Sequence, residues 1–515
     1  MSARLRVLFF TGGPRYYLRQ YSTLGTELAA RGHELHIAFQ PAKGDLPEDA
    51  AGALDASGVT YGFAPERDAE DGWRPVAWIV RALADLARYA HPRYDRAPEL
   101  RSRMAAKIVG HLEKSPEFDP LGRRLALRVA RRLAGRTDTA FSERVIRIAS
   151  RLEQAIPTSD RIDAYIREQS PDVVLATPVV NRASTQVDLL KSARRLGIPA
   201  ATCVASWDNL TNKGLLKWTP ERVFVWNEIQ RKEAAELHRI PADRVVATGA
   251  QLFDAWFERR PSTSRKEFAA KVGLDPARPY VLYTCSNPAM TETPESRFVL
   301  AWLDALRADD RLRGLGVLIR PHPNDSGEWA QIDLGRHENV VVWPRGGVHT
   351  VTDDARADFF DSLAHSAAVV GINTTAMIEA AIGGKSVLTV LAPEFAQEST
   401  LHFDYLLEEH GGFLHVGSSL DDHVGQLARV LEEDAAGAER RRRFVESFVR
   451  PHGLEKPATP ILADAVEQLA TLPVERWQPS PLRPLLALEA ALCALAVRRP
   501  KGSKRGKTRP AAAEG

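Results

Sequence analysis

The chain has 515 residues, of which 44% are hydrophobic and 26% charged, and 69 basic residues against 66 acidic ones leave a net charge of +3. This composition predicts a soluble globular protein of two or three domains, and no segment approaches the roughly 18 apolar residues of a membrane span. Its three cysteines, without a CxxC pair, argue against a disulfide framework or a zinc site and predict a reducing, cytoplasmic environment.

Short β-branched runs alternate with helical stretches along most of the chain, which is the pattern of parallel sheets covered by helices. Seven strands are predicted before a polar break at residues 259–265 and six after it. Two such groups predict an α/β fold with two Rossmann-like domains facing a cleft, at residues 1–258 and 266–425. The predicted strands are 5–10, 35–39, 59–63, 172–177, 200–205, 222–226, 244–248, 280–284, 316–320, 340–343, 368–372, 387–391 and 413–416.

The first predicted strand ends in Gly12-Gly13-Pro14-Arg15, which lacks the GxGxxG spacing of a dinucleotide fold. The second predicted strand ends without the acid that would bind a ribose, so a nicotinamide dehydrogenase is disfavoured. The apolar run before Gly12 is also too short for the core of a signal peptide. Glycines at this turn still allow a ligand to approach the backbone closely.

Residues 74–157 have no strand character and predict a basic helical insert in the first domain. From Arg81 to Arg151 they hold 17 Lys or Arg against 8 Asp or Glu, and residues 121–133 are the clearest basic amphipathic segment. Two interpretations fit this charge. It is either a solvated helical face or a surface for anionic lipid or a phosphorylated acceptor.

The segment 317–325, VLIRPHPND, is an apolar strand that ends in a cation, an imidazole and two prolines. The prolines prevent the chain from continuing the strand or entering a helix, so Arg320 and His322 project from a stiff loop at the strand's carboxyl end. This is the edge at which open α/β sheets bind ligands. A second predicted strand ends at the same edge in a loop that contains Ser286 and Asn287.

A third strand-end loop begins the segment 371–388, GINTTAMIEAAIGGKSVL, which reads as strand, polar turn, helix and strand. Asn373 or Thr374 can cap this helix and leave amides and hydroxyls free for a diphosphate, while Glu379 lies four residues after Thr375, within reach of a ribose diol. An ordinary capped helix is the alternative for this segment alone. Three such loops at one edge favour the phosphates of an activated donor.

The chain ends with residues 479–515, which predict an apolar helix and a polybasic tail. Residues 485–497 are apolar apart from Glu489, and seven basic residues follow within 498–509. An interfacial helix with a polybasic tail and a disordered solubilising tail both fit this composition. The pair Asp353-Asp354 is predicted to be a solvated loop, and no metal site is expected.

The chain resembles the GT-B glycosyltransferase superfamily in its two predicted Rossmann-like domains, the segment VATGAQLFD at 246–254 and the NTTxxxEA helix. The Arg-Pro-His-Pro loop is similar to that of bacterial cell-surface polymer enzymes, namely CDP-glycerol glycerophosphotransferases and capsule sugar transferases. The resemblance implies a donor-binding second domain, an acceptor-binding first domain, crossing helices at 426–475 and no cofactor. The His-Gly-Asp and His-x-Glu-Ala-Gly-Leu-Arg signatures of sugar 2-epimerases that share this fold are absent.

The resemblance also implies roles for single residues on the donor side. Glu379 would bind the donor ribose and Thr374 and Thr375 its phosphates, while Arg320 and His322 would offset charge on the leaving diphosphate, with His322 acting in catalysis. Gln397 and Glu398, in the loop 393–402, would contact the transferred group, although a purely structural loop is the alternative. The remaining predicted donor contacts are Ser286, Asn287 and Asn373.

On the acceptor side, the polar turn 205–214 offers Asp208 as the catalytic base for an acceptor hydroxyl. Asn209 and Lys213 would orient polar groups, although Asp and Asn also form ordinary turns. Gly12, Gly13 and Arg15 complete the predicted acceptor contacts.

These observations together predict a glycosyltransferase that moves a sugar from a nucleotide-activated donor to a cell-surface polysaccharide or lipid-linked acceptor. The enzyme would work in the cytoplasm, at the inner face of the membrane, without nucleic acid as a partner. A CDP-glycerol-type glycerophosphotransferase and a catalytically inactive GT-B binding protein are the alternatives.

Overall fold

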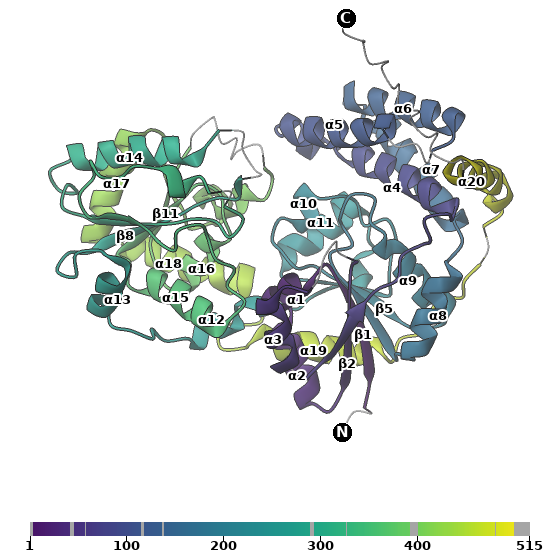
Figure 1. Ribbon diagram of the computed structural model, residues 1–515, viewed down its shortest axis with the longest axis horizontal. Coiled ribbons are helices and arrows are strands. Elements are labelled where there is room, and N and C mark those ends of the chain that lie inside the picture. Colours follow the sequence, from purple (N-terminus) through teal and green to yellow (C-terminus); the bar gives the residue numbers. More distant parts are fainter. Residues whose placement is uncertain are drawn as a thin grey trace, which may run out of the picture.

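The computed structural model shows two α/β lobes lying side by side, with a helical layer above the first lobe (Figure 1). The structure describes residues 4–41, 46–56, 58–114, 118–135, 138–288, 293–325, 327–391, 400–478 and 480–498. Each lobe is built on a parallel sheet. The predicted α/β fold of two Rossmann-like domains is confirmed, and each of the thirteen predicted strands overlaps an observed one.

The first sheet has seven strands in the order β3-β2-β1-β4-β5-β6-β7. Its central strands are buried along almost their whole length, because helices cover both faces of the sheet. The strands are β1 (Arg6–Thr11), β2 (Glu34–Phe39), β3 (Thr60–Phe63), β4 (Val173–Ala176), β5 (Ala200–Cys203), β6 (Arg222–Val225) and β7 (Val245–Ala247). The helices around them are α1 (Pro14–Gln20), α2 (Ser22–Ala30), α3 (Glu48–Ala56), α8 (Asp160–Gln169), α9 (Gln186–Arg195), α10 (Asn209–Asn212) and α11 (Glu228–His238). The short helix α12 (Asp254–Glu258) follows β7, and its Trp256 packs against Phe359 and Phe360 of the second lobe.

The second sheet has six strands in the order β10-β9-β8-β11-β12-β13. Its strands are β8 (Tyr280–Thr284), β9 (Gly316–Arg320), β10 (Val340–Val342), β11 (Ala368–Gly371), β12 (Val387–Val390) and β13 (His415–Gly417). The helices of this lobe are α13 (Arg265–Val272), α14 (Glu295–Ala308), α15 (Asp353–Ala364), α16 (Ala376–Ile382), α17 (Leu420–Glu432) and α18 (Ala435–Phe444). Asp353 and Asp354, expected in a loop, form the first turn of α15, which Thr352 caps.

The insert forms a layer of four helices, α4 (Trp73–Arg88), α5 (Pro98–Lys114), α6 (Pro120–Gly135) and α7 (Thr139–Ala155). Not all of its basic residues face solvent. Arg81 is buried and binds Glu153 of α7 at 2.8 Å and Asp188 of α9 at 2.8 Å, and Lys191 also reaches Glu153 at 2.8 Å. The buried charges are thus paired with one another, and they join the insert to the first domain.

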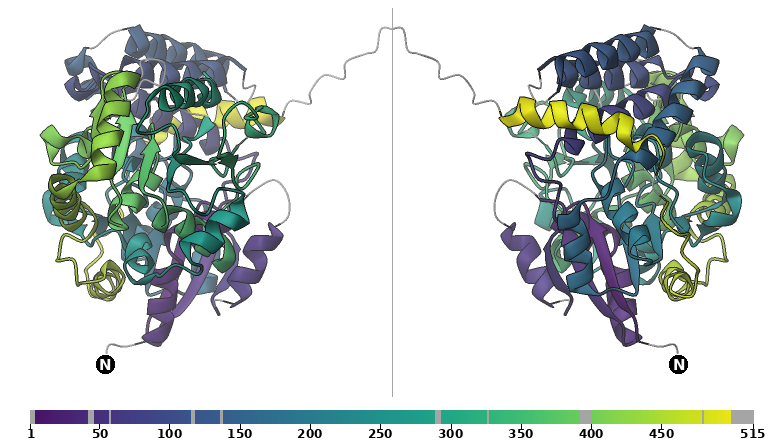
Figure 2. Two further views of the ribbon diagram at one scale, coloured as in Figure 1. Left: turned by 90° about the vertical axis from the view of Figure 1, so that its left-hand side faces the viewer. Right: turned by 90° about the vertical axis from the view of Figure 1, so that its right-hand side faces the viewer.

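The last two helices return to the first lobe. Helix α19 (Ala458–Leu469) packs against α2, with Leu462 and Val466 in the same core as β1. Helix α20 (Arg483–Arg498) lies across the insert, against α4 and α7 (Figure 2). No helix in the described ranges is long and apolar enough to cross a membrane.

Candidate functional site

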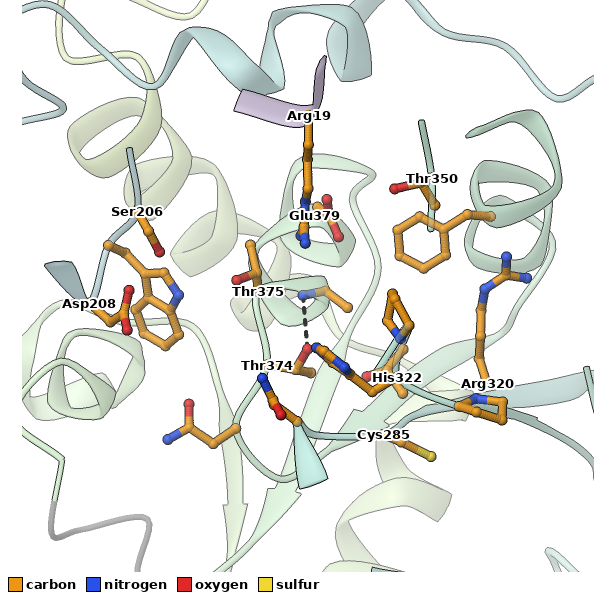
Figure 3. Close-up of a pocket in the computed structure, with 18 of the residues that line it drawn as sticks. Arg19, Ser206, Asp208, Cys285, Arg320, His322, Thr350, Thr374, Thr375 and Glu379 are labelled. Carbon is orange, nitrogen blue, oxygen red and sulfur yellow. Dashed lines mark hydrogen bonds between the residues drawn. The ribbon is translucent and has the colours of Figure 1, made fainter. Parts of the chain in front are cut away.

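A cavity of about 250 Å³ opens between the two sheets, at the carboxyl ends of their strands (Figure 3). The first domain contributes one wall and the second domain the other. The lining residues are Arg19, Ser206, Trp207, Asp208 and Lys213 from the first domain, and Thr284, Cys285, Asn287, Arg320, Pro321, His322, Pro323, Val348, Thr350, Phe359, Asn373, Thr374, Thr375, Ala376, Glu379 and His402 from the second.

The register of three strands builds the second-domain wall. Thr284 of β8 pairs with Arg320 of β9 on one side and with Gly371 of β11 on the other, so three loops leave the sheet at one level. A side chain at position 371 would collide with Thr284, because its Cβ would lie 2.8 Å from the hydroxyl oxygen. The three loops that the sequence places at one sheet edge therefore do meet there.

The polar turn before α16 forms part of the second-domain wall. Asn373 donates its backbone N–H to Ser286 Oγ at 3.3 Å and its side-chain amide to Thr400 Oγ1 at 3.3 Å, so it holds neighbouring loops together. The Thr374 hydroxyl accepts from the N–H of Ala376 at 3.5 Å. Thr375 is the residue before the helix, and its side chain makes no capping bond.

Glu379 lies one turn further along α16 and is 7% exposed. Burial raises the pKa of its carboxyl group, although the charges of Arg19 and Arg320 act in the opposite direction. Arg19 comes from α1 of the first domain and extends toward Glu379 in Figure 3. The two domains thus bring a carboxylate and a guanidinium to the same cavity.

The structure changes the role expected of Arg320. Its buried guanidinium forms an ion pair with Asp358 at 2.9 Å and lies over the ring of Phe359, 5.0 Å from the centroid. Because Asp358 neutralises this cation, Arg320 stiffens the loop and is not a free positive charge. Arg19 places a cation from the opposite wall.

His322 is also different from the expected cation. Burial, together with the charges of Arg19 and His349, lowers the pKa of its imidazole to about 4, so the ring is neutral near pH 7. Its Nδ1 accepts the backbone N–H of Asn324 at 3.0 Å, which leaves the proton on Nε2. His322 can therefore donate a hydrogen bond to a ligand oxygen without carrying a charge.

Asp208 stands on the first-domain wall, in the turn after β5. Burial raises the pKa of its carboxyl group, but Lys213, His402 and a hydrogen bond from Ser206 outweigh burial and hold it below the usual range. Lys213 Nζ lies 3.7 Å from Asp208 Oδ2. Asp208 is accordingly an ionised carboxylate that faces the donor-side loops.

The insert holds this turn in place through two buried side chains, Arg88 at the end of α4 and the next residue, Tyr89. Arg88 donates to the carbonyl oxygens of Leu210 at 3.3 Å, Thr211 at 2.6 Å and Gly214 at 3.2 Å. The Tyr89 hydroxyl donates to the carbonyl of Lys213 at 2.7 Å. The helical insert is therefore part of the support of Asp208.

Several predicted acceptor contacts do not reach the cavity. Gly12 and Gly13 are not among its lining residues, and Arg15 points to α3, where it binds Asp49 at 2.9 Å. Asn209 stabilises its own turn, because its side-chain oxygen accepts from the N–H of Ala205 at 3.3 Å. The alternative of an ordinary turn residue describes Asn209 better.

The other predicted donor positions are Ser286, Asn287, Gln397 and Glu398. Ser286 lines a neighbouring pocket with Glu295, to which it donates its backbone N–H at 2.8 Å, whereas Asn287 lines the main cavity. Gln397 and Glu398 lie outside the described residues.

Several residues that line the cavity were not among the predicted site residues, and Arg19 and His402 are two of them. Arg19 lies one helical turn after Arg15, and this i+4 spacing on α1 was its only local signal. His402 follows β12, and its buried ring meets Trp207 of the first domain edge-to-face with centroids 4.5 Å apart. Burial lowers the pKa of His402 to about 4. No group of His, Cys, Asp and Glu that could hold a metal ion occurs in the described part of the chain.

No protein-family model matches the sequence, and no curated protein matches it. Solved structures do match over nearly the whole chain. The S. aureus MnaA–UDP co-structure has a TM-score of 0.50 at 14% identity and covers 92% of this chain and 99% of its own. The chain has the GT-B fold.

Two further structures of this GT-B group have the same TM-score of 0.50. One is UDP-GlcNAc 2-epimerase from Neisseria meningitidis bound to UDP-GlcNAc, at 13% identity over 90% of this chain and 100% of that one. The other is a glycosyltransferase from Rickettsia africae ESF-5, at 10% identity over 91% and 99%. At these identities the likeness establishes the GT-B fold alone.

Proposed function

We propose that this GT-B protein is a glycosyltransferase that moves a sugar from a nucleotide-activated donor to an acceptor hydroxyl. The observation that carries the proposal is the cavity between the domains. Its second-domain wall offers hydroxyls, a neutral imidazole and Glu379, and its first-domain wall offers the ionised Asp208.

The donor fits the second-domain wall for chemical reasons. Glu379 can accept hydrogen bonds from a ribose diol, and the Thr374 and Thr375 hydroxyls can donate to phosphate oxygens. Arg19 supplies the cation for the diphosphate from across the cavity. In this proposal, protein side chains neutralise the negative charge of the donor diphosphate, and no bound metal or cofactor is required.

The transfer step follows from the facing walls. Asp208 takes the proton of an acceptor hydroxyl, the hydroxyl oxygen forms a bond to the anomeric carbon, and the bond from that carbon to the diphosphate breaks. The nucleoside diphosphate leaves with the bonding electron pair. His322 donates its Nε2 proton as a hydrogen bond to a leaving oxygen, and Arg19 offsets the added charge.

A nucleotide-sugar epimerase is the second candidate, because the UDP-GlcNAc 2-epimerase from Neisseria meningitidis matches 90% of the chain. The sequence lacks the two signatures that such enzymes share, which favours transfer. Within transfer, the Arg-Pro-His-Pro loop supports a cell-surface polysaccharide or lipid-linked acceptor. A CDP-glycerol donor would contact the same phosphate-binding residues, and only the pocket for the transferred unit would differ.

The first experiment is a thermal-shift screen of UDP, GDP, CDP and CMP, followed by titration calorimetry of the best ligand. The corresponding nucleotide sugars are then incubated with polyprenyl-phosphate-linked and soluble glycan acceptors. A transferase releases nucleoside diphosphate only with acceptor, whereas an epimerase changes the sugar without one. Failure of every nucleotide to bind at millimolar concentration would contradict the proposal.

A further inference from the structure

Helices α6 and α20 expose an unusual number of leucines on the outer side of the insert. Leu121 and Leu125 of α6 and Leu485, Leu488 and Leu495 of α20 are each at least 60% exposed, and Leu492 is 37% exposed. Large leucine side chains in one neighbourhood that remain in water are uncommon on a monomeric protein. We call these six leucines the leucine face.

Helix α20 is packed against the insert on its inner side, and its exposed leucines face outward. Its inner side is buried, with Ala490 and Cys493 in the core of the insert. A Cβ at Gly72 would overlap the carbonyl oxygen of Ala490, so this glycine lets α20 approach α4 closely. The outward positions follow the spacing i, i+3, i+7 and i+10, which is one stripe of a helix. Helix α20 is thus fixed on one side and apolar on the other.

Helix α6 continues the leucine face beside α20. A Cβ at Gly122 would overlap the carboxyl group of Glu489, which places the start of α6 against the middle of α20. Leu121 directly precedes this contact in α6, and Leu125 follows it by about one turn. Figure 2 shows α20 running along the outer surface, beside the helices of the insert.

The charge around the leucine face is positive. Helix α6 has five arginines and no acid in its sequence PLGRRLALRVARRLAG. Arg124 and Arg128 are exposed and alternate with Leu121 and Leu125 at the spacing of one helical face. Arg483 and Arg498 stand at the two ends of α20, and six more basic residues follow between positions 499 and 509.

We propose that the leucine face and the arginines of α6 dock this protein on an anionic lipid bilayer. Leucines would enter the boundary between headgroups and acyl chains, and Arg124 and Arg128 would contact lipid phosphates. Charge complementarity decides between occupants, because a second copy would bring arginine-rich helices toward one another, whereas an anionic surface attracts them. This inference rests on the surface alone and holds whether or not the cavity transfers a sugar.

Docking on this side would also bring the first-domain wall of the cavity toward the membrane. Helix α4 contacts α20 and, through Arg88, holds the turn that carries Asp208. The membrane-facing helices and the first-domain wall of the cavity therefore share one structural support. A lipid-linked acceptor would approach from the side on which Asp208 is held.

The experiment measures flotation of the purified full-length protein with phosphatidylcholine vesicles and with vesicles that also contain phosphatidylglycerol, at low and high salt. We compare the wild type with Leu485→Glu/Leu488→Glu, with Arg124→Glu/Arg128→Glu and with a chain that ends at Arg498. The matched control is Arg442→Glu/Arg443→Glu, which changes two exposed arginines of α18 in the other lobe. Thermal melting and circular dichroism verify that each variant is folded.

We expect the wild type and the α18 control to bind anionic vesicles at low salt, with about tenfold or greater weakening in each of the two α6 and α20 variants. Removal of the tail should weaken binding less and only at low salt. Absence of wild-type binding, equal binding to neutral vesicles, or unchanged binding of the leucine variant would each overturn the proposal. So would a solution dimer that the leucine variant dissociates, because the face would then be a protein interface.

Discussion

Replacing Glu379 tests donor binding and the stability of the fold separately. In Glu379→Ala the donor loses hydrogen bonds to a charged acceptor, which contribute about 1.5–3 kcal/mol. This corresponds to a dissociation constant for the nucleotide that is about 10- to 150-fold higher. Glu379→Gln retains one acceptor oxygen without the charge, so its loss should be about half as large in free energy.

Glu379→Gln should weaken nucleotide binding without lowering the stability of the unliganded protein. Burial raises the pKa of Glu379 above its ordinary value of 4.5, so the folded protein holds that proton more tightly than the unfolded chain does. Its contribution to stability is present below pH 4.5 and is lost as the pH rises through the folded pKa. Glu379→Gln, which has no charge to bury, should therefore melt no lower than wild type at pH 7.5.

Calorimetric titration of the best nucleotide, together with thermal melting at pH 7.5, tests both statements. Glu432→Gln, an exposed glutamate at the end of α17, is the matched control. Unchanged nucleotide affinity in both Glu379 variants would remove this residue from the donor site. A lower melting temperature for Glu379→Gln would show that the ionised carboxylate stabilises the fold, which would refute the reasoning from burial.

Three further changes test other parts of the site. Because the pKa of His322 is about 4, the pH–rate profile of the wild type should show no inflection from this residue between pH 5.5 and 8. His322→Ala should lower kcat by about 10- to 100-fold with less effect on donor affinity, and pH–rate profiles of both proteins test the two statements. Asp208→Asn should leave nucleotide affinity within about twofold but lower acceptor-dependent turnover by about 100-fold or more, measured as nucleoside diphosphate release; normal turnover would exclude Asp208 as the base. Arg81→Met should lower the free energy of unfolding by about 3–5 kcal/mol in urea titration, because Glu153 and Asp188 lose a buried partner; a loss below about 1 kcal/mol would mean that the cluster is not stabilising as a unit.

The sequence was most informative where the physical signal is local. Apolar runs of four to six residues between helical stretches mark parallel strands, and the polar break near residue 260 separates the two sheets. Since the carboxyl ends of parallel strands lie at one edge of the sheet, the sequence alone predicted that the loops at 284–288, 320–325 and 371–375 lie together. Thr374, Thr375, Glu379 and His322 were found in this way, and all four line the cavity.

The sequence was least informative where a residue's partner lies far along the chain. Nothing near Arg320 indicates that Asp358, 38 residues later, takes its charge. Helix α20 could be recognised as apolar, but its contact with α4 joins residues more than 400 positions apart.

The sequence by itself thus determined the class of the fold, the positions of the strands along the chain and the three donor-side loops, because these depend on apolar runs, strand ends and turn residues within short windows. Tertiary structure alone decided that Arg19 and not Arg15 reaches the cavity, that His402 meets Trp207 across it, and that His322 is neutral. Protonation depends on burial, and burial at this site arises only when two domains close on each other. No local pattern records that approach, so only the assembled chain shows which charged groups remain free to act.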